Sequence, residues 1–523
     1  MKTVFRTFRV PITAAAVLLS LTALLALSGW SYELPTLADR SEALLRHARY
    51  LASDELAGRG VDNPGIDLAR DYIAAEFKKY GLTPGGQSGG FFQSLEVVVG
   101  VTIKQPNSLI LAGGPALALH QEWIPFGLSR SGSVEAEVVF AGYGITATDY
   151  GYDDYAGLDV KDKIVLVLRY EPPPKDEKSP FRKAPRYSSH ATLLSKANNA
   201  RAHGAVGMIL VDLDQPRSGE KGLIPTRRTL GRTDADIVAT QVKGEVAESR
   251  LEEAGVSLRE LKERIDREEK PASVSLPGLR ASLNVTLEKT TRKTDNVIGV
   301  LPGSDPELKK ENIVIGAHYD HIGLGYFGTR DTKAEGQIHN GADDNASGTA
   351  VLMNLAERLS ARASRPARSV VFIAFTAEEL GLLGSTHYVG HPLFPLAATK
   401  AMINLDMVGR MKGNRLTVAG VDTAKEFRPL VTQAGQEFGV EINPSSRAAG
   451  GSDHAAFYRK NIPVLHFYTG THEDYHKPTD DWEKLDLQGM VKVSEVVLSV
   501  AEKLAMSKEP PIFVHAPAGK PSS

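Results

Sequence analysis

The chain has 523 residues, of which 42% are hydrophobic and 24% charged, and at roughly 150 residues per domain this length predicts about two to four globular domains. These fractions exclude wholesale disorder, a fibrous repeat and a polytopic membrane protein. The 61 Lys and Arg nearly balance the 63 Asp and Glu, and the formal net charge of −2 excludes the basic excess that a nucleic-acid partner requires. Without cysteine there is no disulfide and no thiolate ligand, so any metal must be held by His and carboxylate side chains.

The first 29 residues are predicted to be a signal peptide or an N-terminal anchor. Basic residues precede an apolar run over 10–27, and the small residues Ser28 and Gly29 follow it. This order is typical of a secretory signal, and we expect cleavage near Ser28. The mature chain is therefore expected outside the cytoplasm, in the periplasm or secreted, with membrane attachment only through an uncleaved N-terminal segment.

Two stretches with different character follow the signal. Residues 30–100 are expected to form the N-terminal part of a catalytic domain, with a helix over 65–80 whose apolar residues recur at helical spacing. Residues 101–285 are expected to form a β-rich insert that also carries one charged helix over 251–265. The apolar strands expected within the insert lie at 134–141, 163–169 and 206–211.

Strands and helices alternate over 286–507. Such alternation predicts an α/β domain with a mostly parallel central sheet that is flanked by helices. The residues after 507, which are rich in Pro and Ser, are expected to form a flexible tail over 508–523. The apolar strands expected in this domain lie at 312–317, 370–375, 401–405 and 462–467.

Chemically active side chains follow each of these four strands. Because ligands bind outside the carboxyl ends of the strands of an open α/β sheet, we expect these side chains to converge. Two imidazoles and several carboxylates suit two divalent ions that share a bridging carboxylate. Each residue alone has a structural alternative, such as a helix cap or a surface histidine, but that alternative must explain every position at once. The strand-end residues are His318, Asp320, Glu378, Glu379, Asp406 and His476, and the run Asp343-Asp344-Asn345 opens the helix between the first two strands.

Five motifs in this order resemble those of the two-zinc aminopeptidase family, which includes leucyl aminopeptidases and glutamate carboxypeptidase-like enzymes. The motifs are HYDHIG, IHNGADDNASGTA, FTAEELGLLGS, NLDMVGR and DYHKPTDD. The similarity extends to SDELAGRG at 53–60 and SDHAAFY at 452–458, and the stretch 101–285 resembles the protease-associated (PA) insert of some members. The resemblance implies the zinc exopeptidase fold, with an inserted β-rich protease-associated domain.

The resemblance also implies a ligand set for two zinc ions per chain. It assigns His318 and Asp406 to one ion, and Glu379 and His476 to the other, with Asp343 as the carboxylate that bridges both. A bridging carboxylate and one imidazole per ion are ligands that zinc accepts.

Roles for four further residues come from the same resemblance. Glu378 is expected to be the general base, and Tyr475 is expected to help stabilise the oxyanion. Asp320 is expected to orient the metal histidine that precedes it, and Asp344 to form a cis peptide bond with the residue before it. Other histidines near the motifs, including His321, are expected to support the site or to face solvent.

Three functions remain open at this stage. The first is a secreted aminopeptidase that removes N-terminal residues from peptide substrates. The second is a carboxypeptidase or a glutaminyl-cyclase-like enzyme on the same fold, for which Arg410 and Arg447 are candidates to bind a carboxylate because they lie near the motifs. The third, a non-catalytic receptor-like binding protein, is disfavoured because the ligand positions and the base are intact. The sequence makes no prediction of an oligomeric state.

Overall fold

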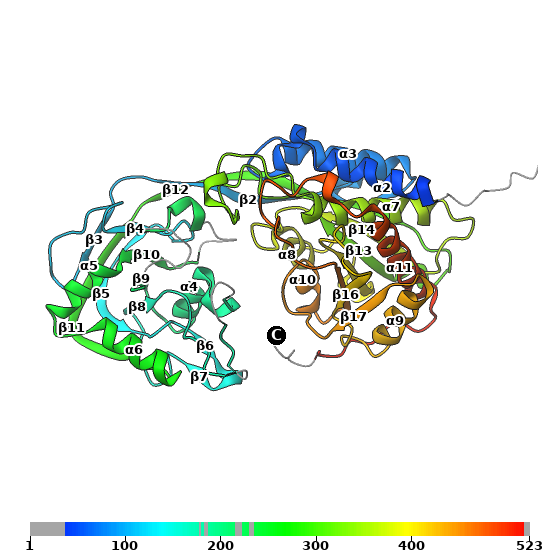
Figure 1. The fold of residues 1–523 in the computed structure, drawn as a ribbon. Helices are drawn as coiled ribbons and strands as arrows, with labels where there is room; N and C mark the ends of the chain where they lie inside the picture. Colours follow the sequence, from blue (N-terminus) through cyan, green and yellow to red (C-terminus); the bar gives the residue numbers. More distant parts are fainter. Residues whose placement is uncertain (1–36, 177–178, 183–186, 215–221, 230–234, 517–523) are drawn as a thin grey trace, which may run out of the picture.

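The computed structural model describes residues 37–516, except 177–178, 183–186, 215–221 and 230–234. The predicted signal segment over 1–29 and the end of the predicted tail lie outside the described residues. Two lobes, each built around its own sheet, are joined by a long two-stranded ribbon (Figure 1). In the described part of the chain, no helix combines the length and apolarity needed to cross a membrane.

The larger lobe contains a nine-stranded sheet. Its strand order is β1, β12, β14, β13, β15, β18, β16 and β17, with β2 paired to β12. The four central strands β14, β13, β15 and β18 are parallel, whereas β12 and β16 join them in the antiparallel direction. The strands are β1 (Thr83–Pro84), β2 (Phe92–Ile103), β12 (Leu287–Leu301), β13 (Asn312–His318), β14 (Ser369–Phe375), β15 (Thr399–Leu405), β16 (Arg415–Ala419), β17 (Glu441–Ser445) and β18 (Val464–Tyr468).

The central strands are continuous apolar runs because helices cover both faces of the sheet. Side chains alternate between the faces, so Ile313 and Ile315 pack in one core while Val314 packs in the other. On the first face lie α2 (Leu37–Leu51), α3 (Gly65–Lys79), α7 (Gly348–Ser360), α9 (Phe427–Glu437) and α11 (Leu487–Met506), and on the second lie α8 (Leu383–Gly390) and α10 (His454–Tyr458).

The smaller lobe, formed by the insert, has a seven-stranded sheet in the order β3, β11, β5, β8, β9, β10 and β4, with two apolar cores of its own. The predicted single charged helix over 251–265 is wrong: two helices are present, and Gly255, with φ at +77°, lies in the turn between them. The elements are β3 (Ser108–Leu111), β4 (Trp123–Pro125), β5 (Gly132–Phe140), β6 (Thr146–Ala147), β7 (Tyr152–Asp153), β8 (Ile164–Leu168), α4 (Leu193–Ala202), β9 (Gly207–Asp212), β10 (Val238–Lys243), α5 (Gly244–Glu252), α6 (Leu258–Glu268) and β11 (Val274–Val285).

The ribbon of β2 and β12 carries the chain between the lobes (Figure 1). A second link lies near the carboxyl ends of the central strands. There Arg227 of the insert forms a 2.6 Å ion pair with Glu335, and its guanidinium lies 5.5 Å from the centre of the Tyr326 ring.

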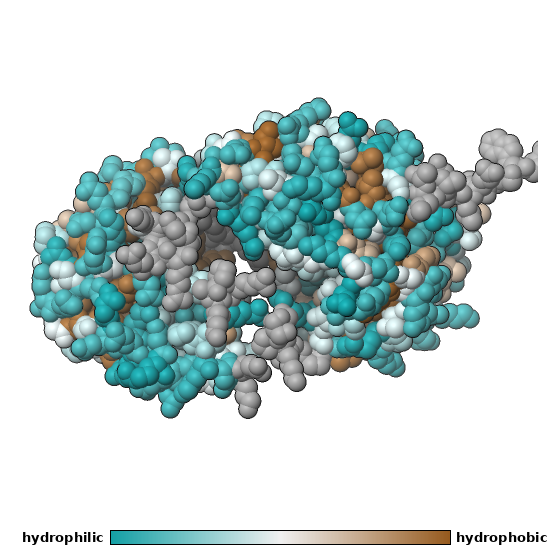
Figure 2. Space-filling view, in the orientation of Figure 1, coloured by the Kyte–Doolittle hydropathy of each residue, from teal (hydrophilic) through white to brown (hydrophobic). Residues whose placement is uncertain are grey.

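The face in Figure 2 is mainly hydrophilic, with apolar side chains in separate small groups.

Candidate metal centre

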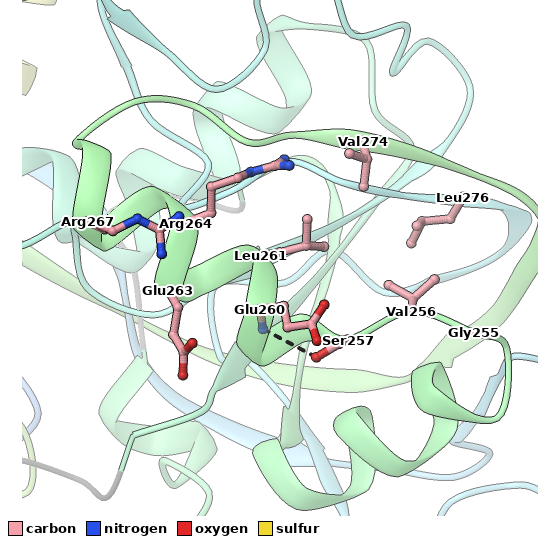
Figure 3. Close-up of a pocket in the computed structure, with 10 residues that line it drawn as sticks. All are labelled: Gly255, Val256, Ser257, Glu260, Leu261, Glu263, Arg264, Arg267, Val274 and Leu276. Carbon is pink, nitrogen blue, oxygen red and sulfur yellow. Dashed lines mark hydrogen bonds between the residues drawn. The ribbon is translucent and has the colours of Figure 1, made fainter.

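Two cavities have very different chemistry. The cavity between α6 and β11 of the insert lobe has a volume of about 440 Å³ (Figure 3). Its walls carry glutamates and arginines on α6 beside apolar side chains, but no histidine. The second cavity, of about 500 Å³, lies at the carboxyl ends of the central strands of the larger lobe and is lined by Asp344, Glu378, Glu379 and Asp406. Carboxylates gathered at strand ends make this second cavity the candidate active site.

One group of metal-binding side chains consists of His318, Asp344 and Asp406. His318 is the last residue of β13, and Asp406 directly follows β15, so the neighbouring parallel strands bring them together. The His318 Nε2 atom lies 3.3 Å from Asp344 Oδ1 and 3.5 Å from Asp406 Oδ1. All three side chains are buried.

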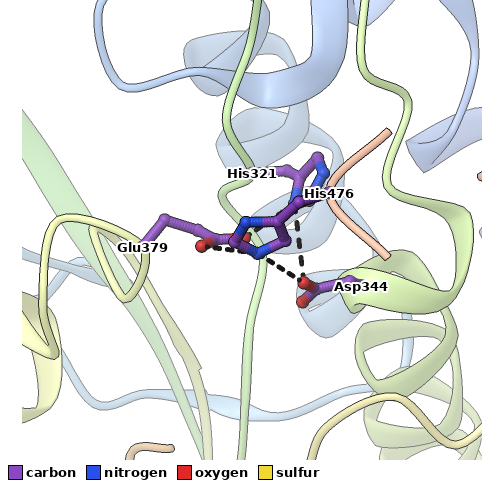
Figure 4. A group of neighbouring side chains, drawn as sticks. All are labelled: His321, Asp344, Glu379 and His476. Carbon is purple, nitrogen blue, oxygen red and sulfur yellow. Dashed lines mark hydrogen bonds and ion pairs between the residues drawn. The ribbon is translucent and has the colours of Figure 1, made fainter. Parts of the chain in front are cut away.

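The second group consists of His321, Asp344, Glu379 and His476 (Figure 4). The His476 Nε2 atom lies 3.1 Å from Asp344 Oδ2 and 3.2 Å from Glu379 Oε2. The His321 Nδ1 atom lies 2.7 Å from Glu379 Oε1. The sequence placed His321 outside the ligand set, although its position in HYDHIG was a signal that it lies near the site.

Asp344 is the carboxylate that belongs to both groups, whereas Asp343, the residue predicted for the bridging position, belongs to neither. The carboxylate of Asp343 turns away and accepts hydrogen bonds from the Gly409 N–H at 2.6 Å and the Ser347 hydroxyl at 3.0 Å. Its other oxygen lies 3.1 Å from Nε2 of His472. Both oxygens of the Asp343 carboxylate therefore have partners outside the metal-binding groups. The carboxylate of Asp344 instead faces both groups.

The predicted cis peptide bond is also displaced by one residue. It joins Asp344 to Asn345 rather than Asp343 to Asp344. The Asn345 amide donates to the backbone carbonyl of Leu405 at 2.9 Å, which ties this turn to the end of β15. The run therefore does more than cap a helix, because its second and third residues connect α7 to the metal-binding groups.

Two aspartates that belong to neither metal-binding group accept hydrogen bonds from the backbone of residues at this centre. Asp320 accepts the N–H groups of Glu378 and Glu379 at 3.0 and 3.2 Å, so it fixes the turn after β14. The Nδ1 atom of His318 bonds to the backbone carbonyl of Asp320 at 3.1 Å, with the carboxylate 3.7 Å away. Asp480, which the sequence did not single out, accepts the N–H groups of both Asp343 and Asp344, at 2.9 and 3.2 Å.

Arg59, in the segment SDELAGRG, connects the N-terminal part of the chain to this centre. Its fully buried guanidinium donates to the backbone carbonyls of Tyr319 at 2.8 Å, Asn340 at 2.7 Å and Gly341 at 2.9 Å, and also to that of Leu51. Tyr319 directly follows His318 in the chain, and Asn340 and Gly341 shortly precede Asp344. The planar donor set of arginine can satisfy several carbonyls at once, which a lysine cannot do.

We expect Arg59→Lys to lower the free energy of unfolding by about 3 kcal/mol, because buried carbonyls lose their donors. Denaturant unfolding followed by circular dichroism measures this change. Arg428→Lys is the matched control, since Arg428 pairs with Asp422 at the surface and should change stability by less than about 1 kcal/mol. Equal effects of the two substitutions would contradict the clamping role of Arg59.

The electrostatics of the centre favour positive charge. Burial alone would lower the pKa of His318, but Asp406 and Glu378 raise it well above its ordinary value. His476 behaves in the same way, since burial is outweighed by Glu379 and Asp344. Carboxylates packed this closely need cations among them, and a metal ion can supply that charge.

Glu378 lies in neither metal-binding group. Burial raises the pKa of Glu378 well above its ordinary value, and the neighbouring Glu379 carboxylate adds to the effect. In contrast, the pKa of Glu379 is lowered to about 2, because the charge of His476 and hydrogen bonds from His321 and His476 outweigh its burial. The two adjacent glutamates are therefore different chemically, and only Glu378 has the high proton affinity of an acid–base group.

Tyr475 lines the same cavity, next to His476, with ring centres 4.0 Å apart. Burial raises the pKa of Tyr475 above its ordinary value, and nearby carboxylates, Asp344 first, raise it further. The phenol therefore keeps its proton and can act as a hydrogen-bond donor. The guanidinium of Arg330 lies 4.5 Å from the centre of the Tyr475 ring.

The donor atoms of the centre fit zinc. Buried atoms without a hydrogen-bond partner include Nε2 of His318, Nε2 of His476 and Oδ1 of Asp406, which are the atoms that a metal ion would bind. Imidazole nitrogens combined with carboxylate oxygens are a usual zinc donor set.

Comparison with known proteins supports the same chemistry. Residues 296–501 match the model of peptidase family M28, and residues 134–249 match that of the PA domain. The chain is 27% identical over 383 residues to aminopeptidase YwaD of Bacillus subtilis (strain 168), which covers 70% of this chain and 69% of the relative. It is also 27% identical over 237 residues to a probable leucine aminopeptidase of Arthroderma otae, covering 42% of this chain and 60% of that relative.

Among solved structures, the fold resembles the aminopeptidase from Aneurinibacillus sp. strain AM-1. The TM-score is 0.54 at 24% identity, and the alignment covers 91% of this chain and 96% of that chain. The predicted α/β exopeptidase fold with an inserted PA domain is confirmed.

Proposed function

We propose that this chain, a metallo-exopeptidase whose residues 296–501 match peptidase family M28 and whose residues 134–249 match the PA domain, is a zinc aminopeptidase that removes N-terminal residues from peptides. The observation that carries the proposal is the shared Asp344. Its two carboxylate oxygens face two separate groups of buried histidine and carboxylate ligands, as a two-metal centre requires.

The proposed ligands of the first zinc are His318, Asp344 and Asp406, and those of the second are Asp344, Glu379 and His476. His321 lies against Glu379 and supports that ligand from the side. Two zinc ions would supply Lewis-acid activation of the attacking water and of the scissile carbonyl.

The residues of the chain carry the proton transfers and the positioning. Glu378 takes the proton of the attacking water and later returns it to the leaving amine. Asp320 accepts a hydrogen bond from the backbone N–H of Glu378 at 3.0 Å and so positions this residue, which lines the cavity. The Tyr475 phenol donates a hydrogen bond to the developing oxyanion.

The insert is proposed to span about 101–285, since its strands from Ser108 to Val285 form a seven-stranded and a two-stranded sheet that are separate from the nine-stranded sheet. The mature chain is proposed to act outside the cytoplasm after cleavage of the N-terminal segment. Mass spectrometry of the N-terminus of the exported protein tests this location, and an intact segment 1–29 on a cytoplasmic protein would contradict it.

We expect the purified chain to hold two zinc ions and to cleave aminoacyl anilides with a free amine. A chelator should remove at least about 99% of this activity, because the ions supply several kcal/mol of transition-state stabilisation, and added zinc should restore it. Metal analysis and a panel of free-amine anilides, N-blocked peptides and acidic dipeptides measure both points. Cleavage of the N-blocked peptides alone would rule out an aminopeptidase, and chelator-resistant cleavage would rule out the metal mechanism.

A further inference from the structure

The cavity beside the metal-binding groups has a second end that the proposed mechanism does not use. This end is formed by β16, β17 and β18, which lie beyond Asp406 and Met407. A volume of about 500 Å³ is enough for one terminal residue together with the scissile peptide bond. The far end is therefore the place where the side chain of the terminal residue would lie.

The register of the three strands builds this wall. Thr417 of β16 pairs with Asn443 on one side and with Tyr468 on the other. One step further, Ala419 lies between Ser445 and His466 in the same way. Because side chains two positions apart on a strand share a face, all six point to the cavity side of the sheet.

The wall is polar. Among the residues that line the cavity, only Met407 and Ala419 have wholly aliphatic or thioether side chains, apart from two glycines. The Asn443 amide donates to the Thr417 hydroxyl at 3.2 Å and the Tyr468 and Thr471 hydroxyls pair with each other, so a leucine side chain would chiefly leave the His466 imidazole unpaired. Leaving buried polar groups unpaired in this way costs about 1–3 kcal/mol for each group.

His466 presents a hydrogen-bond donor at this wall. Its Nδ1 atom accepts a hydrogen bond from the Asn404 amide at 3.1 Å, so the Nε2 atom carries the ring proton. Burial lowers the pKa of His466 to about 4, and the charge of Arg447 contributes to the lowering. The ring is therefore neutral at neutral pH and keeps this tautomer.

Two arginines line the cavity: Arg330, whose guanidinium lies over the Tyr475 ring, and Arg447, which lies two residues after β17. No residue of the described part of the chain forms an ion pair with the guanidinium of Arg447. Arg447 lines the same cavity as His466, and its charge lowers the pKa of that imidazole. Arg410, the other candidate from the sequence, is already paired with Asp474 at 2.8 Å and lies 3.8 Å from Asp480.

We infer that this end of the cavity binds the side chain of the N-terminal residue of the substrate, and that Arg447 selects a carboxylate there, so that peptides beginning with Glu or Asp are preferred. The inference rests on the proposed aminopeptidase function. An ion pair with Arg447 and a hydrogen bond from Nε2 of His466 would satisfy both oxygens of such a side chain. Of the four acidic residues that line the other end, Asp344, Glu379 and Asp406 are proposed zinc ligands, so bound zinc would offset their charge, and Glu378 is the proposed general base.

The test compares kcat/KM of the full-length, zinc-loaded protein for the 4-nitroanilides of Glu, Gln, Leu and Lys. Gln is the uncharged isostere of Glu, so the ratio of Glu to Gln isolates the carboxylate. We expect Glu to exceed both Gln and Leu by about tenfold or more, as one charge-assisted hydrogen bond provides. R447Q should reduce the Glu to Gln ratio to about one, and R447E should favour Lys over Glu.

The matched control is R415Q, which removes an exposed charge from the outer end of β16, where Arg415 pairs with Glu441. It should keep the wild-type ratio of Glu to Gln. Thermal melting and zinc content establish that each variant is folded and loaded. A Leu preference in the wild-type protein, or a Glu to Gln ratio that R447Q leaves unchanged, would overturn the inference while leaving the aminopeptidase function intact.

One further arm separates the two sources of a carboxylate. N-acetyl-Gly-Gln offers a C-terminal carboxylate but no side-chain carboxylate and no free amine, whereas the Glu anilide offers a side-chain carboxylate and a free amine. Cleavage of the first substrate without the second would overturn both this inference and the proposed function. Cleavage of the Glu anilide alone supports both.

Discussion

Replacing Glu378 by glutamine should leave a protein that binds its zinc but cleaves peptides about a thousandfold more slowly. Glutamine keeps the size of the side chain and cannot accept the proton of the attacking water. Glu378 lies outside both metal-binding groups, and its backbone N–H is held by Asp320 at 3.0 Å, so the substitution leaves the ligands in place. The measurements are kcat with the preferred anilide and zinc per chain.

Glu379→Gln is the control for this prediction, because it also replaces a carboxylate by an amide, at the adjacent residue. Glu379 lies in the second metal-binding group, 3.2 Å from Nε2 of His476, so its variant should lose zinc as well as activity. Undiminished kcat in Glu378→Gln would reject the base. Loss of zinc from both variants would show that Glu378 is a ligand instead.

The second large effect separates the adjacent aspartates. Asp344→Asn should lose at least one zinc ion and about 99.9% of its activity, because it removes the carboxylate that faces both histidine groups. Asp343→Asn should keep both ions, since an amide oxygen can still accept from the Gly409 N–H. We expect Asp343→Asn to lower the free energy of unfolding by about 1–3 kcal/mol, because it alters the buried contacts of this side chain.

Zinc analysis after dialysis and thermal melting compare the two variants directly. A reversed result, with zinc retained in Asp344→Asn and lost in Asp343→Asn, would falsify the geometric assignment and restore the one made from sequence.

Strand-end positions were predictable from sequence because they depend on a strong local pattern. Apolar runs of seven or fewer residues end at His318, at Asp406 and shortly before Glu379, and parallel strands place their carboxyl ends at one edge. The structure gathers these three with His476 in the two metal-binding groups that share Asp344. Their individual roles as ligands remain proposals.

The choice between Asp343 and Asp344 could not be made from spacing. Both occupy one turn before α7, and which carboxylate faces the cavity depends on partners far along the chain, such as Gly409 and Asp480. The contribution of Arg59 was hidden for the same reason, since its acceptors include carbonyls more than 250 residues away. Side chains that bond to distant backbone atoms leave no periodic trace in a sequence.

The break in the charged helix of the insert has a local signal in the sequence. Gly255 follows Ala254 in the run Glu252–Val256, and a glycine at positive φ is a common way to end a helix. The leucines on either side of the glycine continue the apolar spacing, so periodicity alone predicts one helix where the structure has two.

The clamp made by Arg59 means that the catalytic unit is discontinuous in the chain. The segment 296–501, taken by itself, would lack this guanidinium together with α2, α3 and most of the ribbon. During synthesis, the first hundred residues must therefore wait until the whole insert has emerged before they can meet the loops that they stabilise. Shortened versions intended for expression need the early helices, and a genetic deletion of the insert needs a linker that rejoins the two strands of the ribbon.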